Sequence, residues 1–181
     1  TGTLTLSSPS PLGPGAYFLA LVVCKTISST PLLRFTPNGQ GPTVVDLQAS
    51  SPTVWTGTLT VTTSMATGTG TFTFQGADLV GNVGQILLSG STYFVDTLRP
   101  TGSIALSPAS PLKAGAAQAT LTLSKDAAAA PNLSFVGAAS STVTLSLAGG
   151  PRVWTATLAI STATGEGTAV FLYNAVDTLG N

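Results

Sequence analysis

Side chains that could do chemistry are few in this chain. Its 181 residues include no His, one Cys, six acidic and six basic residues, and the formal net charge is zero. Without His and with a single Cys, the chain lacks the usual ligands of a zinc site and the base of a serine triad. Glu166 has no carboxylate partner for glycoside hydrolysis, and no G-x-x-x-x-G-K-[ST] phosphate loop is present. The sequence therefore predicts no catalytic residues, no organic cofactor and no enzyme activity.

Charge and hydrophobicity exclude two further classes of protein. The six basic residues are scattered and balanced by six acids, so we expect no binding to a nucleic-acid backbone. Apolar residues make up 43 % of the chain, which argues against disorder. The longest apolar run, 16–24, is too short to span a bilayer and suits a strand, on which Cys24 would act as a small apolar residue. Because the chain opens at Thr1 without Met, we expect a fragment of a longer protein.

The chain contains one sequence twice, at an offset of about 100 residues. The matching segments are 1–16 with 101–116, 54–61 with 153–160, and 68–82 with 167–181. A period of this length suits small domains that each bury their own core, rather than solenoid repeats. We therefore predict two tandem domains, the first spanning 1–100 with its C-terminal linker and the second spanning 101–181.

Within each copy the apolar residues recur at every second position. Ala119, Leu121 and Leu123, for example, alternate with polar residues, as expected for half-buried antiparallel strands. Gly- and Pro-rich turns separate these segments, and no segment has helical spacing. The first copy yields about seven strands, at roughly 3–8, 16–25, 31–36, 43–48, 54–62, 70–78 and 85–95. We predict an all-β fold of two tandem immunoglobulin-like β-sandwich domains, with the equivalent residues Trp55 and Trp154 in their cores.

The two copies differ in two respects. Asn181 aligns with Asn82, so the second copy has no counterpart of 84–100 and is predicted to lack its last strand. That strand is either missing because the sequence is a fragment, or is donated by another chain to the exposed edge. The second difference is a stripe on the nominal outer face of the first copy, where Phe18 and Val22 take the places of polar residues in the second.

The sequence resembles the bacterial Ig-like repeats found in tandem in large surface proteins and adhesins. The residues that carry the resemblance are the pattern G-x-x-x-F-x-F/Y-x-small-x-D-x-x-G-N in both copies and the linker VDTLRP at 95–100, which departs from the family's common V-D-T-T-A-P at Leu98 and Arg99. The resemblance implies an extracellular bacterial protein of many domains, in which each repeat is a spacer or a binding module.

The resemblance also implies a candidate metal site, because some members of that family hold calcium between domains with the linker Asp and the D-x-x-G-N Asp. If successive strands alternate in direction, Asp96, Asp126, Asp177 and Asn181 come to the same end of the second domain. Carboxylate and amide oxygens, with backbone carbonyls and water, are suitable calcium ligands. In the alternative interpretation, Asp177 and Asn181 form an Asx turn that bonds to its own backbone, with Asn181 in a left-handed conformation.

The function predicted from these observations is a non-catalytic spacer or stalk module of a surface-anchored or extracellular bacterial repeat protein. Its partners would be neighbouring repeats of the same chain, without nucleic acid and without a transmembrane segment in this sequence. The alternatives are a glycan- or protein-binding module of an adhesin or secreted enzyme, and a subunit that assembles by strand donation. A binding module needs clustered exposed aromatic side chains, and an assembling subunit needs concentration-dependent association.

Overall fold

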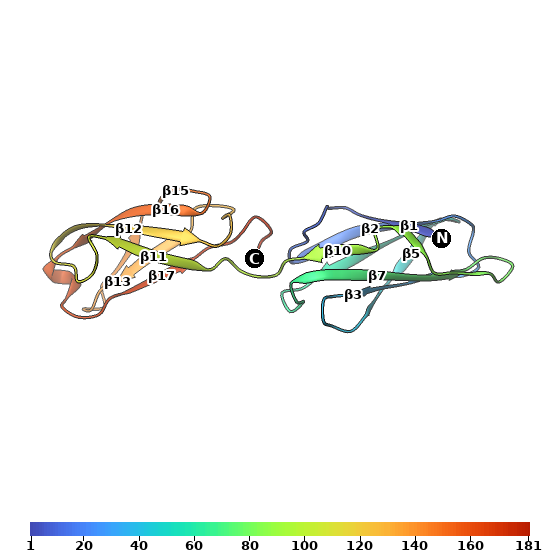
Figure 1. Cartoon of the computed structure of the whole chain (residues 1–181), viewed down its shortest axis with the longest axis horizontal. Helices are drawn as coiled ribbons and strands as arrows, with labels where there is room; N and C mark the ends of the chain where they lie inside the picture. Colours follow the sequence, from blue (N-terminus) through green and yellow to red (C-terminus); the bar gives the residue numbers. More distant parts are fainter. The chain divides into compact units, whose positions relative to one another are not determined.

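A computed structural model describes all residues, 1–181, and divides the chain into two compact units. Unit 1 spans Thr1–Leu98 and unit 2 spans Arg99–Asn181, so the division falls two residues before the predicted boundary. Both units consist of β-strands arranged in two layers (Figure 1). The predicted all-β fold of β-sandwich domains is confirmed. The only helical segment is the 3-10 turn η1 (Thr162–Thr164), and no helix is long and apolar enough to cross a membrane.

Unit 1 is a sandwich of two sheets with strand orders β5-β6-β2-β1-β9 and β10-β7-β3-β4, and β8 pairs with β7 beside the second sheet. Pairing is antiparallel throughout, except between β1 and β9, which run parallel. The strands are β1 (Gly2–Leu6), β2 (Gly15–Val23), β3 (Leu32–Thr36), β4 (Thr43–Val45), β5 (Leu47–Ser51), β6 (Val54–Val61), β7 (Gly68–Ala77), β8 (Val83–Gly84), β9 (Leu87–Ser89) and β10 (Thr92–Val95).

Unit 2 repeats this plan with fewer strands. Its sheets have the orders β11-β12-β16-β15 and β14-β13-β17, all antiparallel. The strands are β11 (Gly102–Ser107), β12 (Gly115–Leu123), β13 (Asn132–Val136), β14 (Thr142–Leu145), β15 (Ala148–Gly149), β16 (Val153–Ile160) and β17 (Val170–Asn174).

The core of unit 1 forms between its two sheets because apolar side chains point inward at alternate positions. Leu19, Leu21 and Val23 of β2 are buried, and they face Leu33 and Phe35 of β3 among the members of one apolar cluster. Each fully buried side chain of this kind contributes about 1.5–3 kcal/mol of hydrophobic stabilisation. Burial of these alternate side chains therefore stabilises the packing of the two sheets.

Aromatic residues fill the same core. The rings of Phe35 and Phe72 lie 4.7 Å apart between their centroids, in a tilted arrangement, and Tyr93 meets Phe72 edge-on at 6.0 Å. Trp55 is buried with 8 % of its surface exposed, so its predicted core position is confirmed. Trp154 of unit 2 is only half-buried, and its indole N–H donates to the carbonyl oxygen of Pro151 at 3.3 Å.

Two of the predicted strands of the first copy are divided in the structure. The segment 43–48 contains β4, which pairs with β3, and then β5, which pairs with β6, so the chain changes sheets at Asp46. The segment 85–95 likewise pairs with β1 through β9 and then returns to β7 through β10. A period of two shows that a segment is extended, but it does not show which neighbour receives its hydrogen bonds.

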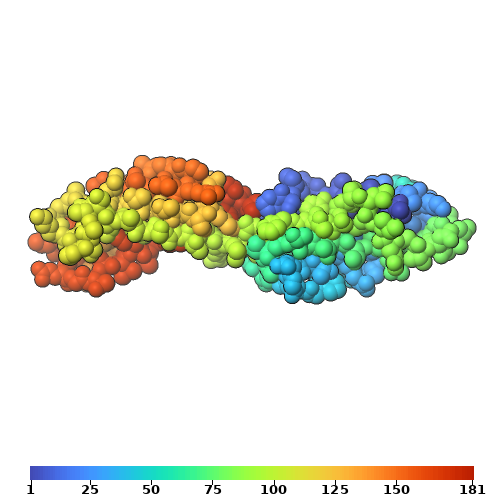
Figure 2. Space-filling view, viewed as in Figure 1, coloured from blue at the N-terminus to red at the C-terminus, as the bar shows by residue number.

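The outer face of β2 carries the predicted apolar stripe in part. Phe18 is 72 % exposed and Val22 is 43 % exposed, whereas the equivalent residues of unit 2 are the exposed polar residues Gln118 and Thr122. The later segment of unit 1 does not cover this face, because Phe18 and Val22 remain exposed. In the space-filling view, that later segment (yellow-green) lies beside the blue first strand (Figure 2).

Candidate functional site

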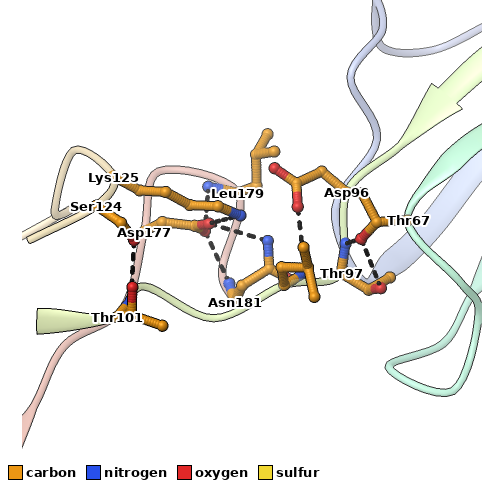
Figure 3. A network of polar contacts seen from close by, with 10 residues as sticks. Thr67, Asp96, Thr97, Thr101, Ser124, Lys125, Asp177, Leu179 and Asn181 are labelled. Carbon is orange, nitrogen blue, oxygen red and sulfur yellow. Dashed lines mark hydrogen bonds and ion pairs between the residues drawn. The ribbon is translucent and has the colours of Figure 1, made fainter.

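The most highly connected polar group of unit 2 is the carboxylate of Asp177, which is 97 % buried at the start of the loop 177–181 (Figure 3). Its Oδ1 accepts hydrogen bonds from the backbone N–H groups of Leu179 at 3.0 Å and Asn181 at 2.9 Å. Its Oδ2 accepts from the side-chain amide of Asn181 at 3.0 Å and from Lys125 Nζ at 3.1 Å. A carboxylate offers about four acceptor positions, and here four N–H donors are directed at them.

These contacts control the ionisation of Asp177. Burial raises the pKa of the carboxyl group, but the hydrogen bonds from Asn181, Lys125 and Leu179 to the charged form outweigh burial, and the pKa lies below its usual value. Asp177 is therefore held as a carboxylate, and its charge is compensated within unit 2 by Lys125. Such a group stabilises the loop and stays ionised near neutral pH.

The backbone of the loop explains the D-x-x-G-N pattern. The N–H of Gly180 donates to the carbonyl oxygen of Asp177 at 3.0 Å, and the N–H of Asp177 donates to the carbonyl oxygen of Asn181 at 3.1 Å. Gly180 adopts a φ of 86°, a conformation that favours glycine. The left-handed conformation expected at Asn181 is thus found at Gly180, and the Asx-turn geometry itself is present.

The same arrangement occurs in unit 1 at lower burial. Asp78 Oδ1 accepts from the N–H groups of Val80 at 3.1 Å and Asn82 at 2.8 Å, and Oδ2 accepts from the Asn82 amide at 3.0 Å. Lys25 Nζ lies 3.6 Å from Oδ2. The hydrogen bonds from Asn82 lower the pKa of Asp78 below its usual value. The loop is therefore a feature of the repeat and not of one copy.

The other predicted metal ligands have partners of their own. Asp126 lies next to the Asp177 loop, because Ala127 forms a β-bridge with Asp177, but its Oδ1 pairs with Arg152 Nε. Asp96 belongs to unit 1, where its Oδ1 accepts the N–H of Leu98 at 3.1 Å. Neither unit by itself gathers three or more acidic, His or Cys side chains in an arrangement suited to a metal ion.

A calcium ion at the Asp177 loop would compete with protein donors. Oxygen ligands suit calcium, and Asp177 and Asn181 supply them, but Lys125 already places a positive charge on Asp177 Oδ2. A cation bound there would have to displace Lys125 from the carboxylate. Calcium binding by Asp96, Asp126, Asp177 and Asn181 stays a prediction of the resemblance.

Both sides of the linker are anchored to their own units (Figure 3). In unit 1, the hydroxyl of Thr97 donates to the carbonyl oxygen of Met65 at 2.7 Å and accepts from the hydroxyl of Thr67 at 3.2 Å. The N–H of Thr97 donates to the same Thr67 oxygen at 3.0 Å. In unit 2, Thr101 and Ser124 exchange hydrogen bonds of 2.9 Å and 2.8 Å. Three residues, 98–100, separate these anchored positions.

Sequence reasoning missed the two lysines as partners of the loop carboxylates. Lys25 and Lys125 lie 100 residues apart, and Asp78 and Asp177 lie 99 residues apart, so both pairs follow the repeat. In a chain with only six basic residues, a Lys at the same position in both copies is a signal that could have identified them.

No model of a known protein family matches the chain. No curated protein sequence matches it either.

Solved structures, in contrast, share the fold. The chain is similar to a structure described as giving insight into host cell surface retention of a 1.5-MDa bacterial ice-binding adhesin, with a TM-score of 0.50 and 16 % identity. The alignment covers 99 % of this chain and 60 % of the adhesin chain, so our chain spans less than two thirds of that structure. At this identity the likeness concerns the fold, and at that level it agrees with the resemblance to bacterial adhesin repeats.

Two further solved structures match more loosely. One is a DUF4785 family protein from Legionella pneumophila, with a TM-score of 0.43, 8 % identity, and coverage of 97 % of this chain and 47 % of the other. The other is a tetra-tandem repeat in the extending region of a large adhesion protein, with a TM-score of 0.40, 15 % identity, and coverage of 100 % and 47 %. Both TM-scores lie below 0.5.

Proposed function

We propose that this chain is a non-catalytic spacer of a bacterial surface protein, in which two β-sandwich repeats add length between other parts of the molecule. The similarity in fold to an adhesin structure supports a role in an adhesin-type protein. The repeated sequence supports a role that each copy performs in the same way. The proposed location is extracellular, at the cell surface, and the proposed partners are neighbouring repeats of the same chain.

The observation that carries this proposal is the parallel pairing of the first and last parts of unit 1. Gly2 of β1 pairs with Leu87 of β9, and Thr3 pairs with Ser89. Because β1 and β9 run in the same direction, and β10 continues from β9, the chain enters unit 1 at one end of the sandwich and leaves it at the other (Figure 1). A domain whose ends lie at opposite poles lengthens the chain that contains it.

The linker between the two units is short and favours an extended backbone. Only residues 98–100 lie between the anchored Thr97 and Thr101, and Pro100 restricts the preceding Arg99 to extended conformations. A short linker that favours extended backbone limits how far neighbouring repeats can fold back on each other. A spacer function of this kind requires no catalytic group.

Small-angle X-ray scattering of the chain tests the spacer. The comparison uses the natural chain and a variant with Pro100→Gly and six Gly/Ser residues inserted after it. A spacer predicts an extended particle for the natural chain and a broader distribution of interatomic distances for the variant. A compact natural chain, or identical curves for both proteins, would contradict the proposal.

A binding module is the second candidate, and the exposed apolar side chains of β2 favour it. Phe18 offers an exposed ring, and Val22 extends the apolar surface along the same face of the strand. Unit 2 provides a matched variant, because the equivalent residues there are Gln118 and Thr122. If this face binds a glycan or a protein, Phe18→Gln with Val22→Thr abolishes binding on a glycan array or to bacterial surface extracts. Unchanged binding by the variant would remove this candidate.

A further inference from the structure

The outer face of the second sheet of unit 1 carries an arginine that has no counter-ion. Arg34 lies on β3 between the buried residues Leu33 and Phe35, so its side chain points away from the core and is exposed. Three of the six basic residues of the chain, at 25, 125 and 152, contact a carboxylate. No carboxylate, including that of Asp46 after the neighbouring strand β4, lies within ion-pair distance of the Arg34 guanidinium. The charge of Arg34 is therefore available to a ligand.

Arg34 lines a polar hollow that is formed by β3, β7 and the segment after β8 (Figure 1). The register of the sheet pairs Arg34 with Thr73 and pairs Leu32 with Gln75, across β3 and β7. The strand β8 pairs with the next residues of β7 and leads into Gln85, which lines the same hollow. The hollow has a volume of about 310 Å³. Sites for small molecules usually measure roughly 300–1,000 Å³, so this one suits a small ligand.

The fold does not use the polar side chains of this hollow. No side-chain hydrogen bond or ion pair within the chain is formed by Arg34, Thr73, Gln75 or Gln85. By comparison, the amide of Gln40 in the same unit donates to a backbone carbonyl oxygen at 3.0 Å and so fastens a loop. The four side chains of the hollow therefore keep their donors and acceptors for a bound molecule.

This polar set is not repeated in unit 2. The positions of Arg34, Thr73 and Gln75 are occupied there by Ser, Leu and Asn, at 134, 172 and 174. The Lys and Asp that close one end of each sandwich, in contrast, occur in both copies. Both units form the same pair of sheets around β3 and β13. The fold of the repeat therefore does not require the polar side chains of the hollow.

The residue types in the hollow indicate which ligand it suits. A guanidinium matches a carboxylate with two parallel N–H···O bonds, and a single positive charge balances one carboxylate. The amides of Gln75 and Gln85 and the hydroxyl of Thr73 both donate and accept hydrogen bonds, as sugar hydroxyl groups also do. Leu32 is half-buried and offers an apolar contact to the C–H groups of a sugar ring. A carboxylate beside several hydroxyl groups satisfies all of these side chains.

We propose that the hollow on β3 and β7 binds an acidic sugar residue, with its carboxylate on Arg34 and its hydroxyl groups on Thr73, Gln75 and Gln85. This site lies on the sheet that does not contain β2, so it is distinct from the apolar stripe of Phe18 and Val22. The proposal goes beyond the spacer function, and neither depends on the other.

The test titrates the full nitrogen-15-labelled chain with methyl glucuronide and follows side-chain N–H signals by NMR. The reporters are the Nε–H of Arg34 and the amide groups of Gln75 and Gln85. We expect these signals to shift along one saturable curve with a millimolar Kd, because the hollow is open to water. Methyl glucoside has a hydroxymethyl group in place of the carboxylate. Since it loses the hydrogen bonds to the guanidinium, it should bind about 10-fold more weakly or worse.

Variants of the arginine give the matched comparison. Arg34→Ser installs the residue that unit 2 has at this position and should weaken glucuronide binding by about 10-fold or more. Arg34→Lys should restore only part of the affinity, because Lys keeps the charge but lacks the planar fork. Lys113→Ser removes the same charge from an exposed position in unit 2 and should leave Kd unchanged. Unchanged backbone amide signals of Phe35 and Phe72 show that each variant is folded.

Several results would overturn the proposal. These are the absence of a saturable shift at the three reporter side chains, equal Kd values for glucuronide and glucoside, and an unchanged Kd for Arg34→Ser. An equal Kd for acetate would mean that the hollow binds any carboxylate and would overturn the assignment to a sugar. The variant Phe18→Gln with Val22→Thr should bind glucuronide normally, and a loss of binding there would assign the sugar to β2 instead. The scattering comparison that tests the spacer is independent of all these results.

Discussion

Lys125 donates a hydrogen bond to Asp177 at 3.1 Å across 52 residues of sequence, and it joins the turn after β12 to the loop after β17. The equivalent pair in unit 1, Lys25 and Asp78, lies 3.6 Å apart with Lys25 largely exposed. The pair therefore closes the same end of each sandwich, more tightly in unit 2. This contact explains why each copy carries one Lys and one Asp at equivalent positions.

Substitution of Asp177 by Asn should destabilise unit 2. Asn cannot accept hydrogen bonds at both oxygen positions and removes the negative charge that Lys125 contacts at Asp177, at a cost of about 1–3 kcal/mol. Urea unfolding in a Trp55→Phe background follows unit 2 through Trp154 alone, since the chain has two Trp. The control is Asp78→Asn in a Trp154→Phe background, where the more exposed pair should cost less. A larger loss in unit 1 than in unit 2 would contradict this account.

The stability of unit 2 should fall in acid. The pKa of Asp177 is lower in the folded state than the value of about 3.9 in the unfolded chain, so the unfolded state binds more protons as the pH falls. The stabilisation is complete above about pH 5 and is lost as the pH falls through the folded-state pKa. Unfolding free energies at pH 6 and pH 3 measure the loss. The Asp177→Asn variant should show a smaller difference, and an equal one would assign the acid sensitivity elsewhere.

Gly70 should not tolerate alanine. A Cβ atom at Gly70 would lie 2.2 Å from Cζ of Phe35, which is itself fully buried. Overpacking of this kind costs about 1–3 kcal/mol. The control is Gly41→Ala, because nothing lies within 4 Å of a Cβ atom there. Thermal unfolding of unit 1 followed by Trp55 should show a lower Tm for Gly70→Ala only, and equal Tm values would mean that Phe35 moves freely.

Mechanical unfolding should occur in two separate events. Each unit has its own core and its own two sheets, so we expect one event per unit. The extended lengths are about 350 Å for the 98 residues of unit 1 and about 300 Å for the 83 residues of unit 2, before the folded length of each is subtracted. Single-molecule force spectroscopy measures both. A single event of the combined length would show that the units unfold cooperatively.

The predicted calcium site has a direct thermal test. If Asp96, Asp126, Asp177 and Asn181 bind calcium, millimolar calcium raises the Tm relative to excess chelator, and Asp177→Asn removes that shift. Lys125→Met should enlarge the shift, because it removes the cation that competes for Asp177 Oδ2. An unchanged Tm for both the natural chain and Lys125→Met would retire the calcium prediction.

Much of the fold could be predicted because its signals are local. The alternation of Leu19, Leu21 and Val23 identifies a strand and its buried face, and the pattern from Asp177 to Asn181 identifies a turn that bonds to itself. The partners of these elements could not be predicted in the same way. The chain changes sheets at Asp46, and no sequence pattern predicts this change. Lys125 contacts Asp177 only because two turns that are distant in sequence lie side by side.

The sequence by itself determined the repeat, the extended segments and their inward faces, because these depend on residue types at fixed spacing along the chain. Only the tertiary structure decided where backbone hydrogen bonds go. It assigned 83–95 to both sheets of unit 1, and it placed all five residues of β17 beside β13. The physical reason is that a strand's hydrogen bonds are made between segments far apart in sequence, so that each strand is complete only when its neighbour is in place.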